Sequence, residues 1–169
     1  MSEDLTILDG GMGGELIRRG WPSGGLWSAK ALLENPEVVR AVHQDYVSAG
    51  AQVIITNSYS TVPSYLAKED MQSRYVELTE IAARLAREVA DAAPAEVRVA
   101  GCLPPLSESY RPDLVPGDDE SRPIYSEIIK ALSADVDLYL CETMSSVREA
   151  VNAASSVRET DPDKPLWVA

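Results

Sequence analysis

The sequence contains little cysteine and histidine and no long apolar run. Its 169 residues include only 2 cysteines and 1 histidine. Two cysteines cannot form the disulfide framework of a small secreted protein, so we predict a cytoplasmic protein. No stretch approaches the roughly 18 consecutive apolar residues that a membrane-spanning helix needs. The first four residues, Met1-Ser2-Glu3-Asp4, are too polar for a secretory signal peptide.

Basic residues are also scarce. The chain carries 15 Lys and Arg against 27 Asp and Glu, which gives a formal net charge of −12. Basic patches bind nucleic acids and anionic membrane surfaces, so we expect neither nucleic acid nor membrane as a partner. The composition, 45% hydrophobic and 25% charged, is typical of a folded globular protein. The length fits the roughly 100–200 residues of one domain.

Short apolar runs alternate with longer runs of helical periodicity, a pattern typical of an α/β protein with a parallel sheet. One helical run begins with the start signal Asn35-Pro36-Glu37, and another opens with the capping-box pattern of Ser146 and Glu149. The segment Leu103–Ser121 is rich in Pro, Ser, Gly and Asp, so we predict a long loop, a kind that is usually functional or mobile. We predict strands at residues 5–8, 51–57, 97–101, 136–140 and 165–169, and helices at residues 36–50, 78–89, 124–132 and 146–157.

Polar residues follow the predicted strands where each strand ends. The carboxyl ends of parallel strands meet at one edge of the sheet, so we expect Asp9, Asn57 and Glu142 to lie close together. Two carboxylates can hold an ammonium group, and glycines let backbone N–H groups approach a carboxylate. The pattern therefore predicts a site for a zwitterionic small molecule. The candidate binding residues are Asp9, Gly10, Gly11, Asn57, Glu142 and Thr143.

Less specific interpretations stand beside this one. Asp9 before two glycines is also a common turn signal, and Glu142 can simply cap the next helix. The glycine-rich segment 10–14 lacks the Lys-Ser/Thr pair of a phosphate-binding loop and does not match G-x-G-x-x-G, which argues against a nucleotide site. Cys102 and Cys141 have no histidine near them in sequence, so we predict buried packing residues and no metal site.

Three further residues have open roles. The single histidine, His43, falls within a predicted helix, where we predict a packing or hydrogen-bonding role. Tyr110 and Arg111 lie in the predicted long loop. They either close over a ligand or anchor the loop.

Six short motifs together resemble one known family. They occur in order along the chain, from about residue 5 to residue 169, and each is modest by itself. The stretch His43–Ala51 matches the pattern H-x-x-Y-x-x-A-G-A. The sequence resembles the homocysteine S-methyltransferase family at Leu8–Gly13, Leu26–Ala29, Asn35–Val39, His43–Ala51, Val53–Tyr59 and Cys141–Met144.

The resemblance implies a TIM barrel, (β/α)₈, that methylates the homocysteine thiol and gives methionine. It implies S-methylmethionine or S-adenosylmethionine as the methyl donor, with betaine and methyltetrahydrofolate in related branches. It also implies that the positions of Asp9 and Glu142 help bind the amino-acid end of homocysteine. Family members hold the thiol on a zinc ion through three cysteines in G-x-N-C and G-G-C-C motifs. This sequence contains neither motif, so we assign no zinc ligand to Cys102 or Cys141.

Counting the strands changes the interpretation of the length. A complete barrel of this type has eight βα units and typically about 250 residues. Only about four units and the start of a fifth strand are predicted here. We therefore expect residues 1–169 to form the N-terminal half of a homocysteine-binding barrel domain, an incomplete barrel that is inactive alone. Because its edges are open, it should associate with another chain, aggregate, or exist only as a piece of a longer protein.

Two alternatives remain. One is a truncated homologue that acts only as an amino-acid-binding or interaction module. The other is an unrelated barrel enzyme that uses Asp9 and Glu142 as an acid–base pair.

Overall fold

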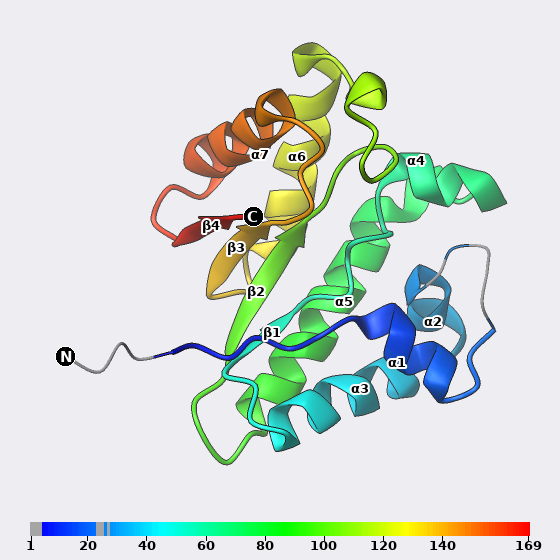
Figure 1. Ribbon diagram of the computed structural model, residues 1–169, viewed down its shortest axis with the longest axis vertical. Coiled ribbons are helices and arrows are strands. Elements are labelled where there is room, and N and C mark those ends of the chain that lie inside the picture. Colours follow the sequence, from blue (N-terminus) through cyan, green and yellow to red (C-terminus); the bar gives the residue numbers. More distant parts are fainter. Residues whose placement is uncertain (1–4, 23–25, 27) are drawn as a thin grey trace.

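The protein is built around a sheet of four parallel strands arranged in chain order (Figure 1). The computed structural model describes residues 5–22, 26 and 28–169. The predicted parallel α/β architecture is confirmed, and four of the five predicted strands are present. The strands are β1 Val53–Ile55, β2 Arg98–Leu103, β3 Leu138–Cys141 and β4 Leu166–Val168.

Helices connect these strands, and each predicted helix is present. Helix α3 starts where the sequence predicts, with Pro36 in its first turn, although the Asn35 side chain makes no capping hydrogen bond. Pro fits there because the first N–H groups of a helix have no intrahelical partner. The helices are α1 Met12–Arg18, α2 Ser28–Glu34, α3 Pro36–Ser48, α4 Pro63–Leu66, α5 Tyr75–Asp91, α6 Asp118–Leu132 and α7 Val147–Thr160, with 3₁₀ turns at Ala67–Glu69, Gln72–Arg74 and Pro112–Leu114.

The first predicted strand, residues 5–8, is reduced to a single parallel bridge between Leu8 and Val53. The segment lies beside β1, where the Asp9 N–H donates to the Val53 carbonyl at 2.9 Å. Leu5 is 84% exposed and Ile7 is 58% exposed. Apolar periodicity predicted a buried strand, but among the described residues this segment has a neighbouring strand on one side only.

Two boundaries also differ from the predictions. The predicted loop Leu103–Ser121 is shorter, because β2 runs to Leu103 and α6 already begins at Asp118. Three acidic residues occupy the first turn of α6, where they stabilise the positive end of the helix dipole. Gly13 and Gly14 belong to α1 and are not part of a glycine loop.

The two faces of the sheet are covered differently. Helices α5, α6 and α7 pack on one face, where they bury a large apolar cluster that includes Val99, Leu103 and Tyr139 (Figure 1). The other face carries a smaller cluster of Val53, Ala100, Leu138 and Leu140. A third cluster joins α1, α2, α3 and α5. The segment that carries Asp9 continues the sheet beside β1, through the bridge between Leu8 and Val53.

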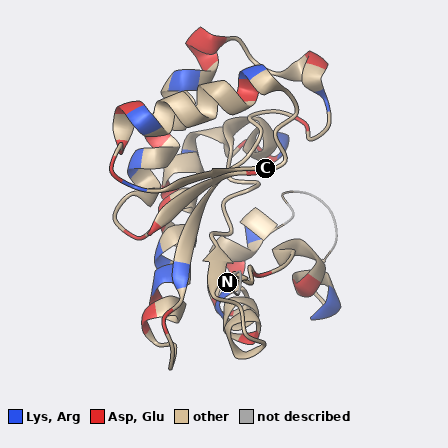
Figure 2. Ribbon diagram, turned by 60° about the vertical axis from the view of Figure 1, so that its left-hand side comes forward, with Lys and Arg blue, Asp and Glu red and all other residues tan. Residues whose placement is uncertain are grey.

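Charged residues lie mainly on helices and loops (Figure 2). Within the four strands, Arg98 at the start of β2 is the single charged residue. No helix in the described ranges combines the length and apolar character needed to cross a membrane.

Candidate functional site

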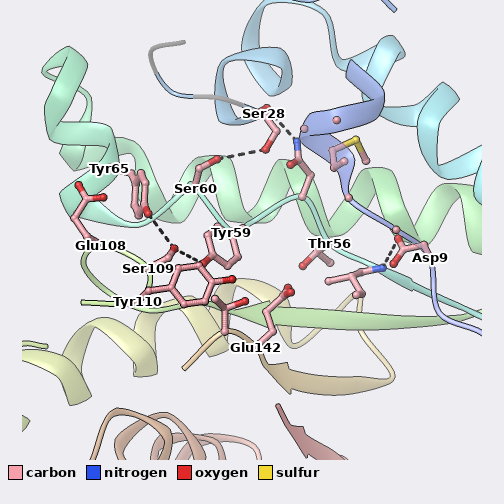
Figure 3. Close-up of a pocket in the computed structure, with 18 of the residues that line it drawn as sticks. Asp9, Ser28, Thr56, Tyr59, Ser60, Tyr65, Glu108, Ser109, Tyr110 and Glu142 are labelled. Carbon is pink, nitrogen blue, oxygen red and sulfur yellow. Dashed lines mark hydrogen bonds between the residues drawn. The ribbon is translucent and has the colours of Figure 1, made fainter. Parts of the chain in front are cut away.

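A cavity of about 870 Å³ opens at the carboxyl ends of the strands (Figure 3). All six predicted binding residues line it. Its other walls come from α1, from the start of α2 and from the loops that follow β1 and β2. The lining residues are Asp9, Gly10, Gly11, Met12, Gly13, Gly14, Ser28, Ile55, Thr56, Asn57, Tyr59, Ser60, Tyr65, Lys68, Glu108, Ser109, Tyr110, Glu142 and Thr143.

The side chain of Asp9 is fixed in the cavity wall by a hydrogen bond to the backbone of β1. Its carboxylate Oδ2 accepts a hydrogen bond from the Ile55 N–H at 2.9 Å, which ties it to the end of β1. The side chain is only 3% exposed, and its Oδ1 has no hydrogen-bond partner within the described part of the chain. Burial, aided by the charge of Glu142 and opposed by the Ile55 N–H, raises the pKa of Asp9 to about 7. A buried acceptor without a donor is uncommon, and a cationic donor would satisfy it.

Glu142 and Thr143 reach the same cavity from the end of β3. The Glu142 N–H donates to the Leu103 carbonyl at 3.3 Å, which extends the β2–β3 ladder by one residue. Thr143 has a φ of 57°, in the left-handed region that β-branched residues rarely adopt. Strain of this kind is typical of functional sites. Glu142, the residue before Thr143, is among the side chains that line the cavity (Figure 3).

Asn57 has a defined contact within the wall. Its buried side-chain amide donates to the Ser28 carbonyl at 3.1 Å, and the Ser28 hydroxyl lies 3.4 Å from that of Ser60. These contacts tie the start of α2 to the segment after β1 (Figure 3). Part of the hydrogen-bonding capacity of Asn57 is therefore used by the fold.

The two predicted glycines differ in their surroundings. A Cβ added to Gly10 would lie 2.8 Å from the Tyr46 hydroxyl, so the absence of a side chain lets Tyr46 pack against this backbone. The Tyr46 hydroxyl in turn donates to the Gly11 carbonyl at 3.4 Å. A Cβ added to Gly11 would meet no atom within 4 Å. Gly10 is thus needed for packing, whereas Gly11 leaves open space in the cavity wall.

The sequence did not predict the aromatic side of the cavity. The Tyr59 hydroxyl lies 2.6 Å from the Ser109 hydroxyl, and the Tyr65 hydroxyl lies 3.4 Å from it (Figure 3). Lys68 and Glu108 form an ion pair at 3.0 Å beside them. The position of Tyr59, two residues after Asn57, was the available sequence signal. Tyr65 and Lys68 lie on the short elements α4 and Ala67–Glu69, for which the sequence has no periodicity.

Tyr110 also lines this side of the cavity, whereas Arg111 pairs with Asp113 on the surface. Tyr110 has a φ of 61° and is mostly exposed. Of the two loop residues considered from the sequence, Tyr110 is therefore the one placed to contact a ligand.

The buried carboxylate of Glu149 joins the two loops that carry these residues. It accepts hydrogen bonds from the N–H groups of Leu106 at 3.3 Å and Ser145 at 2.9 Å. The predicted capping box is therefore half correct. The Ser146 hydroxyl accepts from the Glu149 N–H at 3.2 Å, but the Glu149 carboxylate bonds to Leu106 and Ser145 instead of returning to Ser146.

The buried side chain of His43 lies close to the carboxylate of Asp9. The imidazole, on α3, is fully buried, and its Nδ1 is 3.9 Å from the Asp9 Oδ2. Neither ring nitrogen has a hydrogen-bond partner among the described residues. Burial lowers the pKa of His43 to about 4, so the ring is neutral at neutral pH. Of the two predicted roles, packing is present, and no hydrogen bond of His43 is formed with the residues that the structure describes.

The cysteines do not fit a metal site. Within the described residues, no three His, Cys, Asp or Glu side chains are grouped so as to hold a metal ion. Cys141 packs on the helix-covered side of the sheet with Leu103. Cys102 precedes Leu103 on β2 and so points to the opposite face. Burial raises the pKa of both thiols, that of Cys141 to about 12, which disfavours the thiolate form that binds zinc.

Known proteins of similar sequence and structure are homocysteine methyltransferases. The homocysteine S-methyltransferase of Escherichia coli K12 is 33% identical over 180 residues, which cover 98% of this chain and 58% of that protein. The homocysteine S-methyltransferase YbgG of Bacillus subtilis is 31% identical over 183 residues, with the same coverage of 98% and 58%.

A solved structure agrees with these sequence matches. The metallated form of the homocysteine methyltransferase MmuM from Escherichia coli superposes with a TM-score of 0.86 at 32% identity, and the match covers 99% of this chain and 63% of that one. This chain thus spans about three fifths of the length of these relatives. The family model for homocysteine S-methyltransferase matches residues 6–169. The chain therefore belongs to the homocysteine S-methyltransferase family.

Proposed function

We propose that the cavity binds homocysteine, with its ammonium group between Asp9 and Glu142. The single observation that carries this proposal is that Asp9 lines the cavity with a buried Oδ1 that has no hydrogen-bond partner among the described residues. An ammonium group supplies the missing donor and neutralises part of the charge that Glu142 adds to the site. Binding therefore favours the ionised form of Asp9, whose pKa lies near 7 in the free protein.

The remaining predicted residues complete the proposal. The open space at Gly11 lets a ligand carboxylate approach the backbone. Asn57 and Thr143 line the same cavity, so they can contact the amino-acid end of the ligand. The aromatic side of the cavity, near Tyr59, would then contact the thiol end of homocysteine and the methyl donor.

The wider reaction is methyl transfer to the homocysteine thiol, which gives methionine. The donor is S-methylmethionine or S-adenosylmethionine. Zinc in this family supplies a stabilised thiolate. The two cysteines of this chain do not fit a zinc site, and no step of the reaction is assigned to them. We propose that the metal-binding cysteines belong to a part of the domain outside these 169 residues, and that this chain forms the N-terminal half of a (β/α)₈ barrel in the cytoplasm.

Calorimetry with two matched ligands tests the binding proposal. We expect the chain to bind L-homocysteine. The analogue 4-mercaptobutanoate lacks only the amino group, and we expect its affinity to be at least tenfold lower because a charge-assisted hydrogen bond is lost. Equal affinity for the two compounds would refute the assigned role of Asp9 and Glu142.

A second assay tests the activity of the chain by itself. Incubation with homocysteine, either methyl donor and Zn²⁺ is expected to yield no methionine. Zinc-dependent methionine formation would overturn the proposal that a further cysteine-bearing part is required.

The alternative function, an interaction module, is favoured by a different observation. Ile7 and Val168, at the two outer margins of the sheet, are both exposed apolar residues. Strand margins of this kind pair readily with other chains. An interaction module would bind a partner chain without any dependence on homocysteine, which separates it from the first proposal.

A further inference from the structure

The arrangement of His43 and Asp9 is unusual for a buried pair. Both side chains are almost completely removed from solvent, yet their closest polar atoms, Nδ1 and Oδ2, are 3.9 Å apart. Both imidazole nitrogens and the Asp9 Oδ1 lack hydrogen-bond partners in the described ranges. Three unsatisfied polar atoms at one place in a protein interior call for an explanation, because such atoms are usually paired.

Among the described residues around His43, Asp9 is the charged group close enough to become a hydrogen-bond partner. The buried residues that α2 and α5 contribute are apolar or hydroxyl-bearing, and none is titratable. Arg40 of α3 and Glu88 of α5 are partly exposed and pair with each other. Tyr46, one turn further along α3, contacts the backbone of Gly11.

The remaining charge near the pair belongs to the cavity. Glu142 acts on Asp9 from the end of β3. Glu15 on α1 pairs with Arg18 at the surface. Asp9 is therefore the one carboxylate within ion-pair distance of His43 among the described residues.

We propose that His43 is a positioning residue for Asp9: when Asp9 ionises, as an ammonium group bound at the carboxylate favours, the neutral imidazole donates its Nδ1–H to Oδ2 and fixes the ionised carboxylate in the cavity wall. The proposal rests on the proposed binding of homocysteine. In the free protein the two groups stand just beyond hydrogen-bond distance. A ligand that favours the ionised form of Asp9 makes its Oδ2 a stronger acceptor and draws the ring closer.

Neutrality of the imidazole is essential to this role. A cationic side chain behind Asp9 would compete with the ligand for the same negative charge. A neutral donor orients the carboxylate and leaves its charge available to the ammonium group. The apolar environment of His43 keeps the ring neutral and thereby preserves selectivity for a cationic ligand.

Three variants separate positioning from packing. In His43→Asn the side-chain amide nitrogen takes the place of Nδ1, so the donor to Asp9 is kept. In His43→Gln the amide nitrogen takes the place of Nε2 and points away. His43→Leu keeps the volume and removes both nitrogens. Circular dichroism and thermal unfolding identify any variant that does not fold, and the Asn and Gln variants suffice for the comparison if the Leu variant fails.

The first measurement follows the ¹³Cγ resonance of Asp9 against pH in the absence of ligand. Above its titration midpoint Asp9 is ionised even without ligand, and the proposal has the imidazole donate to that form. We therefore expect the Asp9 midpoint to rise in the Gln and Leu variants, which lose this donor, and to stay near the wild-type value in the Asn variant. Identical midpoints in all four proteins would overturn the proposal.

The second measurement is the affinity for homocysteine by calorimetry. We expect about a tenfold loss in the Gln and Leu variants, recovery to within about threefold in the Asn variant, and unchanged affinity for 4-mercaptobutanoate in each of them. Equal loss for both compounds in every variant would assign His43 to packing alone. If the wild-type chain does not bind homocysteine, the proposed function fails, while the Asp9 midpoints still decide whether His43 acts on Asp9.

Discussion

At the scale of single residues, the ionised form of Asp9 that would bind a cation is also the form that lowers the stability of the fold. Burial raises its pKa from 3.8 to about 7, so the folded state binds this proton more tightly than the unfolded state does. Stability is therefore lost as the pH rises from about 4 to about 7. The side chain best placed to bind a cation is thus one whose ionisation destabilises the folded protein.

Replacing Asp9 with Asn is expected to stabilise the chain at pH 8. The neutral amide removes the burial penalty of the carboxylate, which amounts to at most about 4 kcal/mol above pH 7. Urea unfolding at pH 5 and pH 8 measures this, with the larger gain at pH 8. The variant is also expected to lose homocysteine binding. A gain of the same size at both values of pH would contradict the assigned pKa shift.

His43 is expected to give the opposite pH dependence. Its pKa is lowered from 6.5 to about 4, so the stability it contributes is present above pH 6.5 and is lost as the pH falls toward 4. In the wild-type chain this loss and the gain from Asp9 largely cancel. In Asp9→Asn the free energy of unfolding should fall by up to about 3 kcal/mol between pH 6.5 and pH 4. A flat profile in that variant would show that His43 titrates normally.

Gly10 and Gly11 are expected to respond differently to the same added methyl group. Gly10→Ala forces Tyr46 away from the backbone and should lower the free energy of unfolding by about 1–2 kcal/mol. Gly11→Ala places its methyl group in open cavity space, so stability is retained and ligand binding weakens. Thermal unfolding and calorimetry on the two variants test this. Equal destabilisation would argue against the packing of Tyr46 on Gly10.

The sequence predicted the polar half of the site because one simple rule applies to it. Asp9, Asn57 and Glu142 each follow an apolar run, and the carboxyl ends of neighbouring parallel strands must meet. Tyr65 and Ser109 lie in short or irregular segments, where position depends on tertiary contacts that no local pattern encodes. The approach of His43 to Asp9 brings helix α3 to the irregular segment beside β1, and the sequence alone could not reveal it.

At the scale of elements, the start of α7 organises two loops through Glu149. Its carboxylate accepts from Leu106 in the loop after β2 and from Ser145 in the loop after β3. Ser109 and Thr143 lie a few residues away in these same loops and line the cavity. One helix start therefore holds together both loops on that side of the site.

Replacing Glu149 with Gln is expected to loosen both loops. Gln retains one acceptor oxygen and places an NH₂ group against a backbone N–H, which should cost about 1–3 kcal/mol. Hydrogen exchange of the Leu106 and Ser145 amides should accelerate together. Glu159→Gln, an exposed position on the same helix, serves as the matched control and should change neither. Acceleration of one amide alone would show that the carboxylate does not join the loops.

Element boundaries were predicted best where the pattern was long. Helices α5 and α7 have regular apolar faces, and the sequence located both. The segment at residues 5–8 has the composition of a strand, but strand formation depends on neighbours, and the described chain provides only β1. The start of α6 was missed because its first turn is acidic and carries no apolar periodicity.

At the scale of the whole molecule, the sheet has two outer margins with exposed apolar residues. Ile7 lies beside β1, and Val168, 55% exposed, lies on β4. Unpaired strand margins bind other strands. The predicted parallel architecture is confirmed, whereas closure into a barrel remains a proposal, because it depends on strands beyond the four observed here.

The chain is accordingly expected to self-associate as its concentration rises. Ile7→Lys places a charge on one margin and should shift the sedimentation coefficient toward that of a monomer. Glu159→Lys, an exposed change on α7 that adds positive charge away from the margins, is the control. A wild-type chain that remains monomeric at high concentration would show that these margins do not drive association.

The order of the strands has a consequence for how the protein is made. Each strand pairs with the strand that precedes it in the chain, from β1 to β4. During synthesis, every new strand therefore finds its neighbour already in place, and no later segment must insert between two earlier ones. Such a chain can fold progressively from its N-terminus while it emerges from the ribosome. Asp9 is translated well before Glu142. The ligand site is therefore complete only after β3 and the residue that follows it have been added to the sheet.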